Sequence, residues 1–487
     1  MRRRVFCPTR WLALFVGAAL TVALLASCGG GTQTTQQPTT GGVRLTLSDP
    51  PTCKAPIGDF TNVWVTVTRV RAHISSTANP DDGGWVDLVD LRNSPKQIDL
   101  LSIGDTSCTL ATLGSTAGLT PGNYQQIRLY LLSNNPAAGE ATPSPNNCGA
   151  IGYNCAQLEG GSIQTLLLSS EDKTGIKIPP GRIAGGAIQI EAGKTADINI
   201  DFSACQSILR QGNGQFRLKP TLHAGEVSLT TDSISGKVVD SVTGIPIPNA
   251  TIFVLAEQPD SEGIDRVIRQ RTANPTDGTF TLCPLPAGNY DIVVAAVSEA
   301  GVTYNATITF HVPTGTALGS IPLTPETGTS TAPGEIDGEV STAGAVGTAT
   351  GSDVALAAFQ EATPSGGTAT LVTTPLLPGS TENVATEALP TCTTGTKCAT
   401  YSLYLPASNP VVGTFTTSGT IYAGPVVGDV LYRVNARAFV PGSGGTANCS
   451  PSSLTTDKDN QANPLKATAG TSVTAEALAF TGCTEGY

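Results

Sequence analysis

The sequence predicts an all-β protein built from tandem β-sandwich domains. Turn-forming residues are dense, with 54 Gly and 34 Pro, while helix-favouring Met occurs once and only 13% of the 487 residues are charged. Short stretches in which apolar and polar residues alternate recur between turn signals, as is typical of sandwiches. At about 150 residues per domain, the length predicts about three domains, each large enough to bury a core.

The N-terminus has the pattern of an export signal. Three arginines, Arg2 to Arg4, precede an apolar run of 16 residues from Trp11 to Ala26, which is shorter than the ~20 residues needed to span a bilayer. Leu25-Ala26-Ser27-Cys28 then resembles the lipobox of bacterial lipoproteins, in which the cysteine is acylated and becomes the new N-terminus. The resemblance implies a signal peptide at 1–27 and a lipidated Cys28. An ordinary secretory signal and an uncleaved membrane helix are the alternatives.

The charge of the chain limits its partners. The formal net charge is −11, and removal of the four arginines of the signal leaves −15. Such a surface repels nucleic acid and anionic lipid, so the acylated Cys28 is expected to provide the membrane contact. Residues 28–42 are uncharged after Cys28 and form a flexible tether. The localisation expected is extracytoplasmic. Gly29 stands where lipoproteins retained at an inner membrane tend to have Asp, which favours an outer membrane if the host has one.

A first unit is predicted over 43–228, with strands read from alternation and from the turns between them. Asn213-Gly214 is a hairpin signal, and the Asn-, Pro- and Gly-rich stretch 134–161 reads as one long loop. The predicted strands are Val43–Leu47, Val63–Ile74, Ile127–Leu132, Ala187–Ile190, Ala196–Phe202 and Gln215–Leu218. The stretches 45–50, 119–129 and 216–220 resemble a bacterial domain-of-unknown-function family found in exported lipoproteins. This resemblance implies a fold but no activity.

A second unit is predicted over 232–325. Asp277-Gly278 supplies a turn with positive φ, and Pro286-Ala287-Gly288 reverses the chain before a strand that starts at Tyr290. We expect Gly288 also to need positive φ, and the unit to fold alone. Its expected core is Ile234, Val238, Ile252, Val254, Phe280, Tyr290, Ile292 and Val294. The order of these motifs resembles the carboxypeptidase regulatory-like domain, a transthyretin-type sandwich with a carbohydrate-binding-like fold. No catalytic residue carries over from that family, whose modules are structural or interaction units.

A third, β-rich unit is predicted over 334–487. Its first strand, Ile336-Asp337-Gly338-Glu339-Val340, echoes Ile234-Ser235-Gly236-Lys237-Val238, so a second related sandwich is expected to begin here. Further strands are read at 354–359, 401–405 and 432–440. The Asp-Gly and Pro-x-Gly turns of the second unit have no counterpart in it.

The cysteines favour disulfides over a metal site. Twelve are present, and ten remain after Cys7 and Cys28 are assigned to the signal and the lipid. An even number in an exported chain is typical of disulfides, whereas the short spacings do not fit a zinc knuckle and have no His beside them. Proximity predicts the pairs Cys53–Cys108, Cys148–Cys155, Cys392–Cys398 and Cys449–Cys483. Cys205 and Cys283 either pair across the boundary between units or leave one thiol free.

Candidate site residues are few. The chain has only three histidines and none of the common catalytic, phosphate-binding or zinc motifs, so no catalytic residue, metal or cofactor is expected. Arg69, Arg71 and His73 alternate along one strand, which indicates either an anion- or sugar-acid-binding stripe or the solvated face of an edge strand. Their parity continues that of buried valines, so either a β-bulge intervenes or the strand leaves the core there. Trp64 and Trp85 are expected to pack in the core, with a carbohydrate platform as the alternative.

The function predicted is that of a lipid-anchored cell-envelope protein with a non-catalytic binding or scaffold role. A carbohydrate-binding surface protein is the second hypothesis, and a hydrolase the third. The partners expected are membrane lipid and either an envelope protein or a glycan. The loop 134–161 is the expected recognition surface, because a rigid sandwich holds its loops at low entropic cost.

Overall fold

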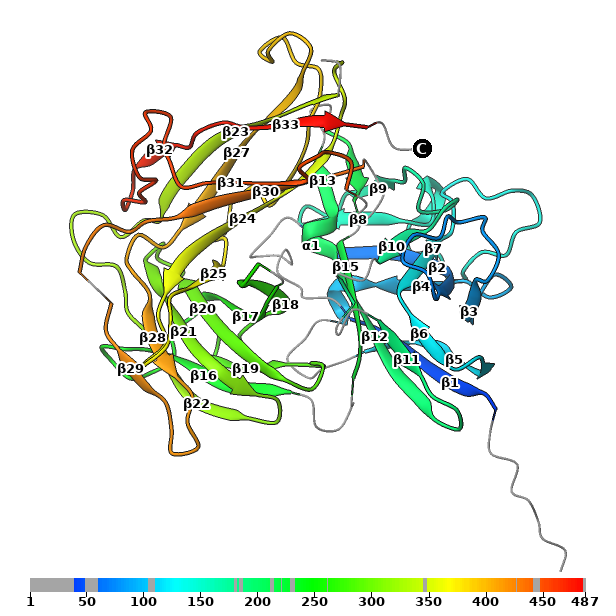
Figure 1. The fold of residues 1–487 in the computed structure, drawn as a ribbon, viewed down its shortest axis with the longest axis horizontal. Helices are drawn as coiled ribbons and strands as arrows, with labels where there is room; N and C mark the ends of the chain where they lie inside the picture. The colour runs from blue at the N-terminus through cyan, green and yellow to red at the C-terminus, as the bar shows by residue number, and fades with distance from the viewer. Residues whose placement is uncertain are drawn as a thin grey trace, which may run out of the picture. The chain divides into compact units, whose positions relative to one another are not determined.

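The computed structural model describes residues 39–48, 60–103, 110–178, 182–183, 187–210, 214–219, 221–227, 233–260, 262–344, 348–425, 427–440 and 447–484. The expected signal peptide, Cys28, Cys53, Cys108 and the side chain of Cys205 lie outside this description. The described chain is almost entirely β-structure, which is the predicted fold class (Figure 1). Its helical turns are η1 (Leu100–Ser102), η2 (Gly149–Ile151) and α1 (Ala204–Ser207). No helix among these residues has both the length and the apolarity to cross a membrane.

The N-terminal strands form two main sheets. One has the order β15-β12-β1-β5, in which β1 (Gly41–Ser48) runs parallel to β12 (Thr195–Ser203) and antiparallel to β5 (Ala111–Leu119), with β15 (Thr221–Glu226) at the edge. The other has the order β10-β7-β2-β8-β9-β14-β13, with β3 and β4 also paired to β2. Its strands are β2 (Phe60–His73), β3 (Val86–Asp90), β4 (Lys96–Asp99), β7 (Gln126–Leu131), β8 (Cys155–Leu158), β9 (Ile163–Leu167), β10 (Ile176–Ile178), β13 (Ile208–Arg210) and β14 (Phe216–Leu218). A separate pair is β6 (Gly122–Tyr124) and β11 (Ile188–Ile190).

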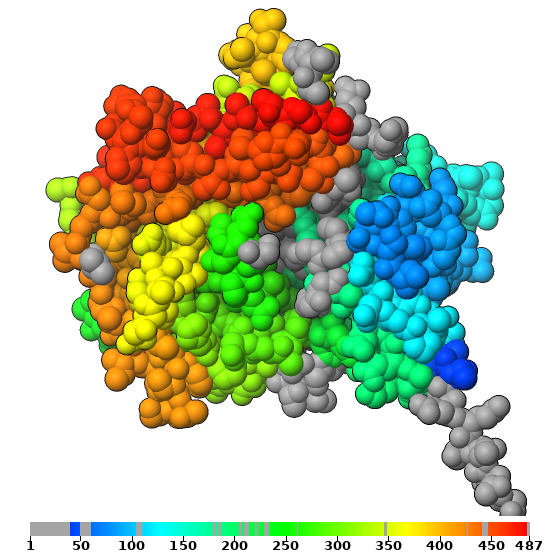
Figure 2. Space-filling model, in the orientation of Figure 1, coloured from blue at the N-terminus to red at the C-terminus, as the bar shows by residue number. Residues whose placement is uncertain are grey.

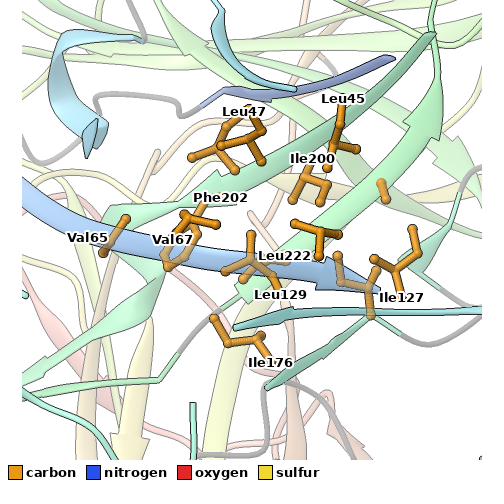
Figure 3. Close-up of a cluster of buried hydrophobic side chains, with 14 of the residues drawn as sticks. Leu45, Leu47, Val65, Val67, Ile127, Leu129, Ile176, Ile200, Phe202 and Leu222 are labelled. Carbon is orange, nitrogen blue, oxygen red and sulfur yellow. The ribbon is translucent and has the colours of Figure 1, made fainter. Parts of the chain in front are cut away.

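These two sheets bury one hydrophobic core between them. Side chains of β1, β12 and β15 meet those of β2, β7 and β10 (Figure 3). The residues labelled there are Leu45, Leu47, Val65, Val67, Ile127, Leu129, Ile176, Ile200, Phe202 and Leu222. Alternation at 43–47 and 63–67 predicted which side chains of these strands point inward. All the residues labelled in Figure 3 are fully buried. Neither Trp64 nor Trp85 belongs to this core; both are half-buried, so the expectation that they pack inside it is wrong.

The second core contains every residue expected for it. The eight side chains from Ile234 to Val294 are at most 2% exposed and belong to one cluster. They lie between a three-stranded sheet, β19-β16-β22, and four strands of a larger sheet. The former consists of β16 (Ile234–Asp240), β19 (Thr279–Leu282) and β22 (Ala317–Leu323), and the latter strands are β17 (Thr251–Pro259), β18 (Ile264–Thr272), β20 (Asn289–Val297) and β21 (Thr303–Pro313).

Strand pairing crosses the expected boundary between the second and third units. The larger sheet has the order β29-β28-β21-β20-β17-β18-β25-β24-β30-β31, with β26 paired to β24. Strands from the C-terminal part of the chain therefore pair with the second unit at both of its edges, β25 with β18 and β28 with β21. In Figure 2 the yellow surface of β25 adjoins the green surface of β18. These strands are β24 (Asp353–Ala362), β25 (Thr370–Thr374), β26 (Asn383–Ala385), β28 (Val411–Thr414), β29 (Ile421–Ala423), β30 (Arg433–Phe439) and β31 (Ser453–Thr456). The second unit thus shares its sheet, in contrast to the self-contained sandwich expected.

The echo between 234–238 and 336–340 marks two equivalent strands. β16 and β23 (Gly334–Gly344) each have an antiparallel neighbour on one side and a parallel one on the other. The partners of β23 are β27 (Lys397–Leu405), β32 (Ser472–Thr474) and β33 (Leu478–Cys483). Gly236 and Gly338 each lie opposite an aromatic residue, Phe280 or Tyr401, whose ring a Cβ would meet at 2.7 or 2.3 Å. The repeated glycine therefore makes room for a ring on the neighbouring strand.

The two turn glycines of the second unit differ. Gly278 has φ of 72°, as expected, and a Cβ there would lie 2.3 Å from the carbonyl oxygen of Val238. Gly288 is not among the residues with positive φ, so that expectation is wrong. A Cβ at Gly288 would instead meet the end of the flexible Gln258 side chain at 3.0 Å and the Tyr290 ring at an ordinary contact distance of 3.9 Å.

Three of the expected disulfides are present: Cys148–Cys155, Cys392–Cys398 and Cys449–Cys483. Cys283 is also disulfide-bonded, and its partner is not among the described cysteine side chains. The alternative in which Cys283 stays a free thiol is therefore wrong.

Candidate functional site

The strand that carries Arg69, Arg71 and His73 is central in its sheet. β2 pairs with β7 along 67–73 and with β3 along 69–72, so the interpretation as an edge strand is wrong. The register shifts between Val67 and Arg69 and again between Val70 and Arg71. These irregularities are the expected bulge, and they explain how the parity of buried valines continues into charged residues.

The three side chains of the predicted stripe are engaged within the fold. Nε of Arg69 donates to Oδ1 of Asp87 at 2.7 Å, and Nε of Arg71 lies 3.4 Å from the same oxygen. Nε2 of His73 lies 3.0 Å from the carbonyl oxygen of Gly83, while Nδ1 accepts from the backbone N–H of Ser75. Because Asp87 already neutralises part of the arginine charge, the stripe as a whole is a weak anion site.

Trp85 organises the far end of this stripe. The guanidinium carbons of Arg71 and Arg128 lie 5.4 and 5.5 Å from the Trp85 ring, and the His73 ring lies 5.1 Å from it. The indole N–H donates to the carbonyl oxygen of Asn79 at 2.8 Å. Such cation–π contacts are stabilising, so Arg71 and His73 hold the 79–85 turn against the sheet.

Arg69 also lines a hollow of about 620 Å³ in the first unit. The lining also includes Arg92, Tyr130, Lys173 and residues from 137–141 of the predicted recognition loop. The Arg69 guanidinium lies 5.7 Å from the Tyr130 ring. The structure thus brings one residue of the predicted stripe together with the predicted loop. The sequence carries no signal for Arg92, Tyr130 or Lys173, because they meet only through the register of the sheet.

The loop is fixed to β2 at its base by asparagines. Oδ1 of Asn134 accepts from the backbone N–H groups of Tyr153 and Asn154, each at 2.9 Å. Fully buried Asn154 donates to the carbonyl oxygen of Leu132 and accepts from the N–H of Thr66. Residues 155–158 are strand β8, so 134–161 is not one loop. Its complete deletion would therefore remove part of the sheet.

The hollow offers both hydrogen-bond donors and a ring face. Its cations are Arg69, Arg92 and Lys173, and its acids are Glu140 and Asp172. Arg92 bonds Asp90 through two nitrogens, and this contact lowers the pKa of Asp90 to about 2. Its volume fits a small ligand, since binding pockets commonly measure about 300–1,000 Å³. Its lining therefore supplies polar contacts of both charges.

A separate group of buried carboxyls lies within the large sheet. Glu257 and Asp265 are at most 1% exposed, and Asp291 is the cross-strand partner of Glu257. Burial, followed by a hydrogen bond to Asp291, raises the pKa of Asp265 to about 8. Burial and the charge of Asp265 raise the pKa of Glu257 well above its usual range. Across the described residues, no cluster of three or more His, Cys, Asp or Glu is arranged to hold a metal ion.

Because of these buried carboxyls, we expect the free energy of unfolding to fall as the pH rises from 5 to 7. Asp265 is protonated in the folded chain but ionised when unfolded, where its pKa is about 3.9, so the unfolded state binds fewer protons. Over this interval the buried Asp265 carboxyl therefore lowers the free energy of unfolding as the pH rises. Asp265→Asn should reduce the decline and stabilise the protein at pH 7, as measured by urea unfolding at both pH values. The exposed Asp277→Asn should leave the decline unchanged, and equal slopes for all three proteins would contradict the prediction.

Comparison with known families assigns two segments of the chain. Residues 40–220 match the Domain of unknown function (DUF4382), and residues 233–321 match the Carboxypeptidase regulatory-like domain. The chain therefore carries these two domains in the order that the sequence motifs indicated. Among curated proteins, none matches it.

The solved structures that resemble the chain share little sequence identity with it. The TIE protein of Bacillus anthracis is 9% identical with a TM-score of 0.14; the match covers 91% of this chain and 51% of that protein, so the chain spans about half its length. Shaft pilin SpaA from Lactobacillus rhamnosus GG is 10% identical with a TM-score of 0.17, and the match covers 59% of this chain and 99% of the pilin. The streptococcal ancillary pilin is 11% identical with a TM-score of 0.15, and the match covers 80% of this chain and 96% of that pilin. Similarities this low carry no conclusion about function.

Proposed function

We propose that this protein is a lipid-anchored, non-catalytic binding protein of the cell envelope, and that its first domain binds an acidic glycan. The lipid would be attached at Cys28, and the tether up to residue 42 would hold the β-domains away from the membrane. The absence of Asp at position 29 favours an outer-membrane site where the host has such a membrane. A glycan is preferred to a protein partner because the candidate site is a ligand-sized hollow.

The hollow beside Arg69 is the observation that carries the proposal. It combines three cationic side chains with the Tyr130 ring, and its rim is a loop that Cys148–Cys155 and two asparagines hold in place. Guanidinium groups bind carboxylates well, and aromatic rings pack against the apolar faces of sugars. A rigid rim reduces the entropy lost on binding. These properties suit recognition of an acidic sugar without chemical change to it.

The test compares binding of a uronic-acid oligosaccharide with binding of the neutral oligosaccharide of the same linkage and length. Arg92 and Lys173 are exposed, so Arg92→Glu and Lys173→Glu should leave the fold intact. Each should weaken binding of the acidic oligosaccharide by about tenfold or more, measured by calorimetry. Lys458→Glu, an exposed charge reversal outside the hollow, is the matched control and should change nothing.

Two results would overturn this function. Failure of the wild-type protein to bind the acidic oligosaccharide, or equal binding by all variants, would remove the proposed site. Hydrolysis of the oligosaccharide, lost on changing one Asp, Glu or Ser, would replace the binding protein by an enzyme.

Anchoring is predicted to depend on Cys28 alone, because the tether is uncharged and the domains are acidic. Cys28→Ser should give uncleaved precursor or soluble protein, measured by membrane fractionation and by the mass of the N-terminal peptide. Normal processing and membrane association of this variant would show that the lipobox interpretation is wrong.

A further inference from the structure

A lysine and an asparagine from distant parts of the chain meet in the interior. Lys219 follows β14 directly and is only 3% exposed, which is rare for lysine. Its Nζ lies 3.4 Å from Oδ1 of Asn383, the first residue of β26, although 164 positions separate the two residues. The amide carbon Cγ is bonded directly to that oxygen. The amine nitrogen therefore lies beside the amide group, in contact with the oxygen that Cγ carries.

The surroundings favour the neutral amine of Lys219. Nζ lies 5.1 Å from the Phe439 ring, which excludes water on that side. Burial is the main cause that lowers the pKa of Lys219 to about 7, and the charges of Arg182 and Arg217 act in the same direction. A neutral lysine is a nucleophile, whereas its ammonium form has no lone pair to donate.

A buried carboxyl lies beside both groups. Asp353 is fully buried and forms an ion pair with Arg217. Its charge raises the pKa of Lys219, against the larger effect of burial. In the antiparallel pair of β24 and β26, Ala355 is opposite Asn383 and Asp353 is opposite Ala385. Asp353 and Asn383 therefore share one face of the sheet as diagonal neighbours. This position allows the Asp353 carboxylate to exchange protons with groups at the Asn383 amide.

We propose that the Lys219 amine and the Asn383 side-chain amide react with each other and join as an intramolecular isopeptide bond. The Nζ lone pair attacks Cγ, so that an Nζ–Cγ bond forms and the Cγ–Nδ2 bond breaks. Nδ2 leaves as ammonia and takes the proton that Nζ loses, which Asp353 accepts and passes on. No electron transfer takes place and no co-reactant is needed. The product is lighter than the unreacted chain by one ammonia, about 17 Da, as follows from exchange of one amide nitrogen for another.

The bond would tie the end of the DUF4382 segment to the C-terminal strands. Lys219 lies at the end of residues 40–220, and Asn383 lies beyond the carboxypeptidase regulatory-like segment at 233–321. A covalent link between them closes a chain loop that contains that whole domain. Such a link limits the separation of the joined ends when the chain is pulled or cleaved within the loop.

Peptide mapping of the purified, reduced protein tests the proposal. A protease digest should contain a branched peptide, whose mass is that of the Lys219 and Asn383 peptides together less one ammonia. Fragmentation should place the branch at these two residues. Lys219→Arg keeps a buried cation and Asn383→Ala removes the amide, and neither variant should give the branched peptide. Lys458→Arg, at an exposed lysine outside the hollow, should give it as the wild type does.

Asp353→Asn tests whether the Asp353 carboxyl assists the reaction between Lys219 and Asn383. The branched fraction should fall at least tenfold after the same incubation at pH 7, with circular dichroism used to confirm that the variant is folded. Absence of the branched peptide from folded wild-type protein would overturn the proposal. The same ammonia loss in Lys219→Arg would also overturn it, since the loss would then come from another asparagine.

Discussion

Arg269→Met is expected to lower the free energy of unfolding by about 3–5 kcal/mol, because it leaves a buried carboxylate without its partner. Arg269 and Asp201 are 4% and 8% exposed at their side chains and form an ion pair. The same guanidinium donates to Oγ of Ser48 at 2.7 Å and to the carbonyl oxygen of Pro284 at 3.0 Å. The Arg269 guanidinium therefore binds residues of β1, β12 and the 283–286 segment at the same time.

The measurement is urea unfolding followed by tryptophan fluorescence. Trp64 and Trp85 are the two tryptophans outside the expected signal peptide, and both lie in the first unit with Asp201. A double variant, Asp201→Asn with Arg269→Met, should lose less stability than the two single variants together, since the unpaired charge is gone. The exposed pair Arg92–Asp90 is the matched control, and Arg92→Met should cost less than about 1 kcal/mol. Equal costs for Arg269→Met and Arg92→Met would contradict the prediction.

Gly278→Val is expected to destabilise the second unit by more than about 4 kcal/mol, which exceeds the effect of most single substitutions. A β-branched residue at φ of 72° is strained by about 1–3 kcal/mol. In addition, its Cβ would overlap the carbonyl oxygen of Val238, which is backbone within β16 and cannot move without breaking the sheet.

Substitutions at Gly244 and Gly288 of the same unit distinguish backbone strain from the overlap of Cβ with Val238. Gly244 has φ of 71° but no atom within 4 Å of a Cβ, so Gly244→Val measures the strain alone. Gly288→Val should have the smallest effect of the three, because φ is not positive there and the neighbouring Gln258 side chain can turn aside. Far-ultraviolet circular dichroism in urea would rank them. A cost for Gly278→Val no larger than that for Gly244→Val would show that the Val238 overlap is relieved elsewhere.

Residues close together in the sequence determined much of this protein by themselves. The alternation at 43–47 and 63–67, the turn at Asp277-Gly278 and the pairs Cys148–Cys155 and Cys392–Cys398 all depend on neighbours within a few positions. Their backbone preferences and short spacings restrict the local conformation whatever the rest of the chain does. The fold class and a part of the strands could be predicted for that reason, whereas Gly288 shows that even a turn motif does not fix φ at each position.

Only the tertiary structure decided what surrounds each functional side chain. Arg69 could be singled out by its spacing, yet its partner Asp87, its place in a central strand and the other residues that line the hollow all depend on which strands pair. The same is true of the ion pair of Arg269 and the meeting of Lys219 with Asn383. Strand pairing between distant segments depends on a register that alternation alone leaves open, since many registers bury the same apolar face. Sequence periodicity therefore determined which side chains point inward, and the register of the sheets decided which of them meet.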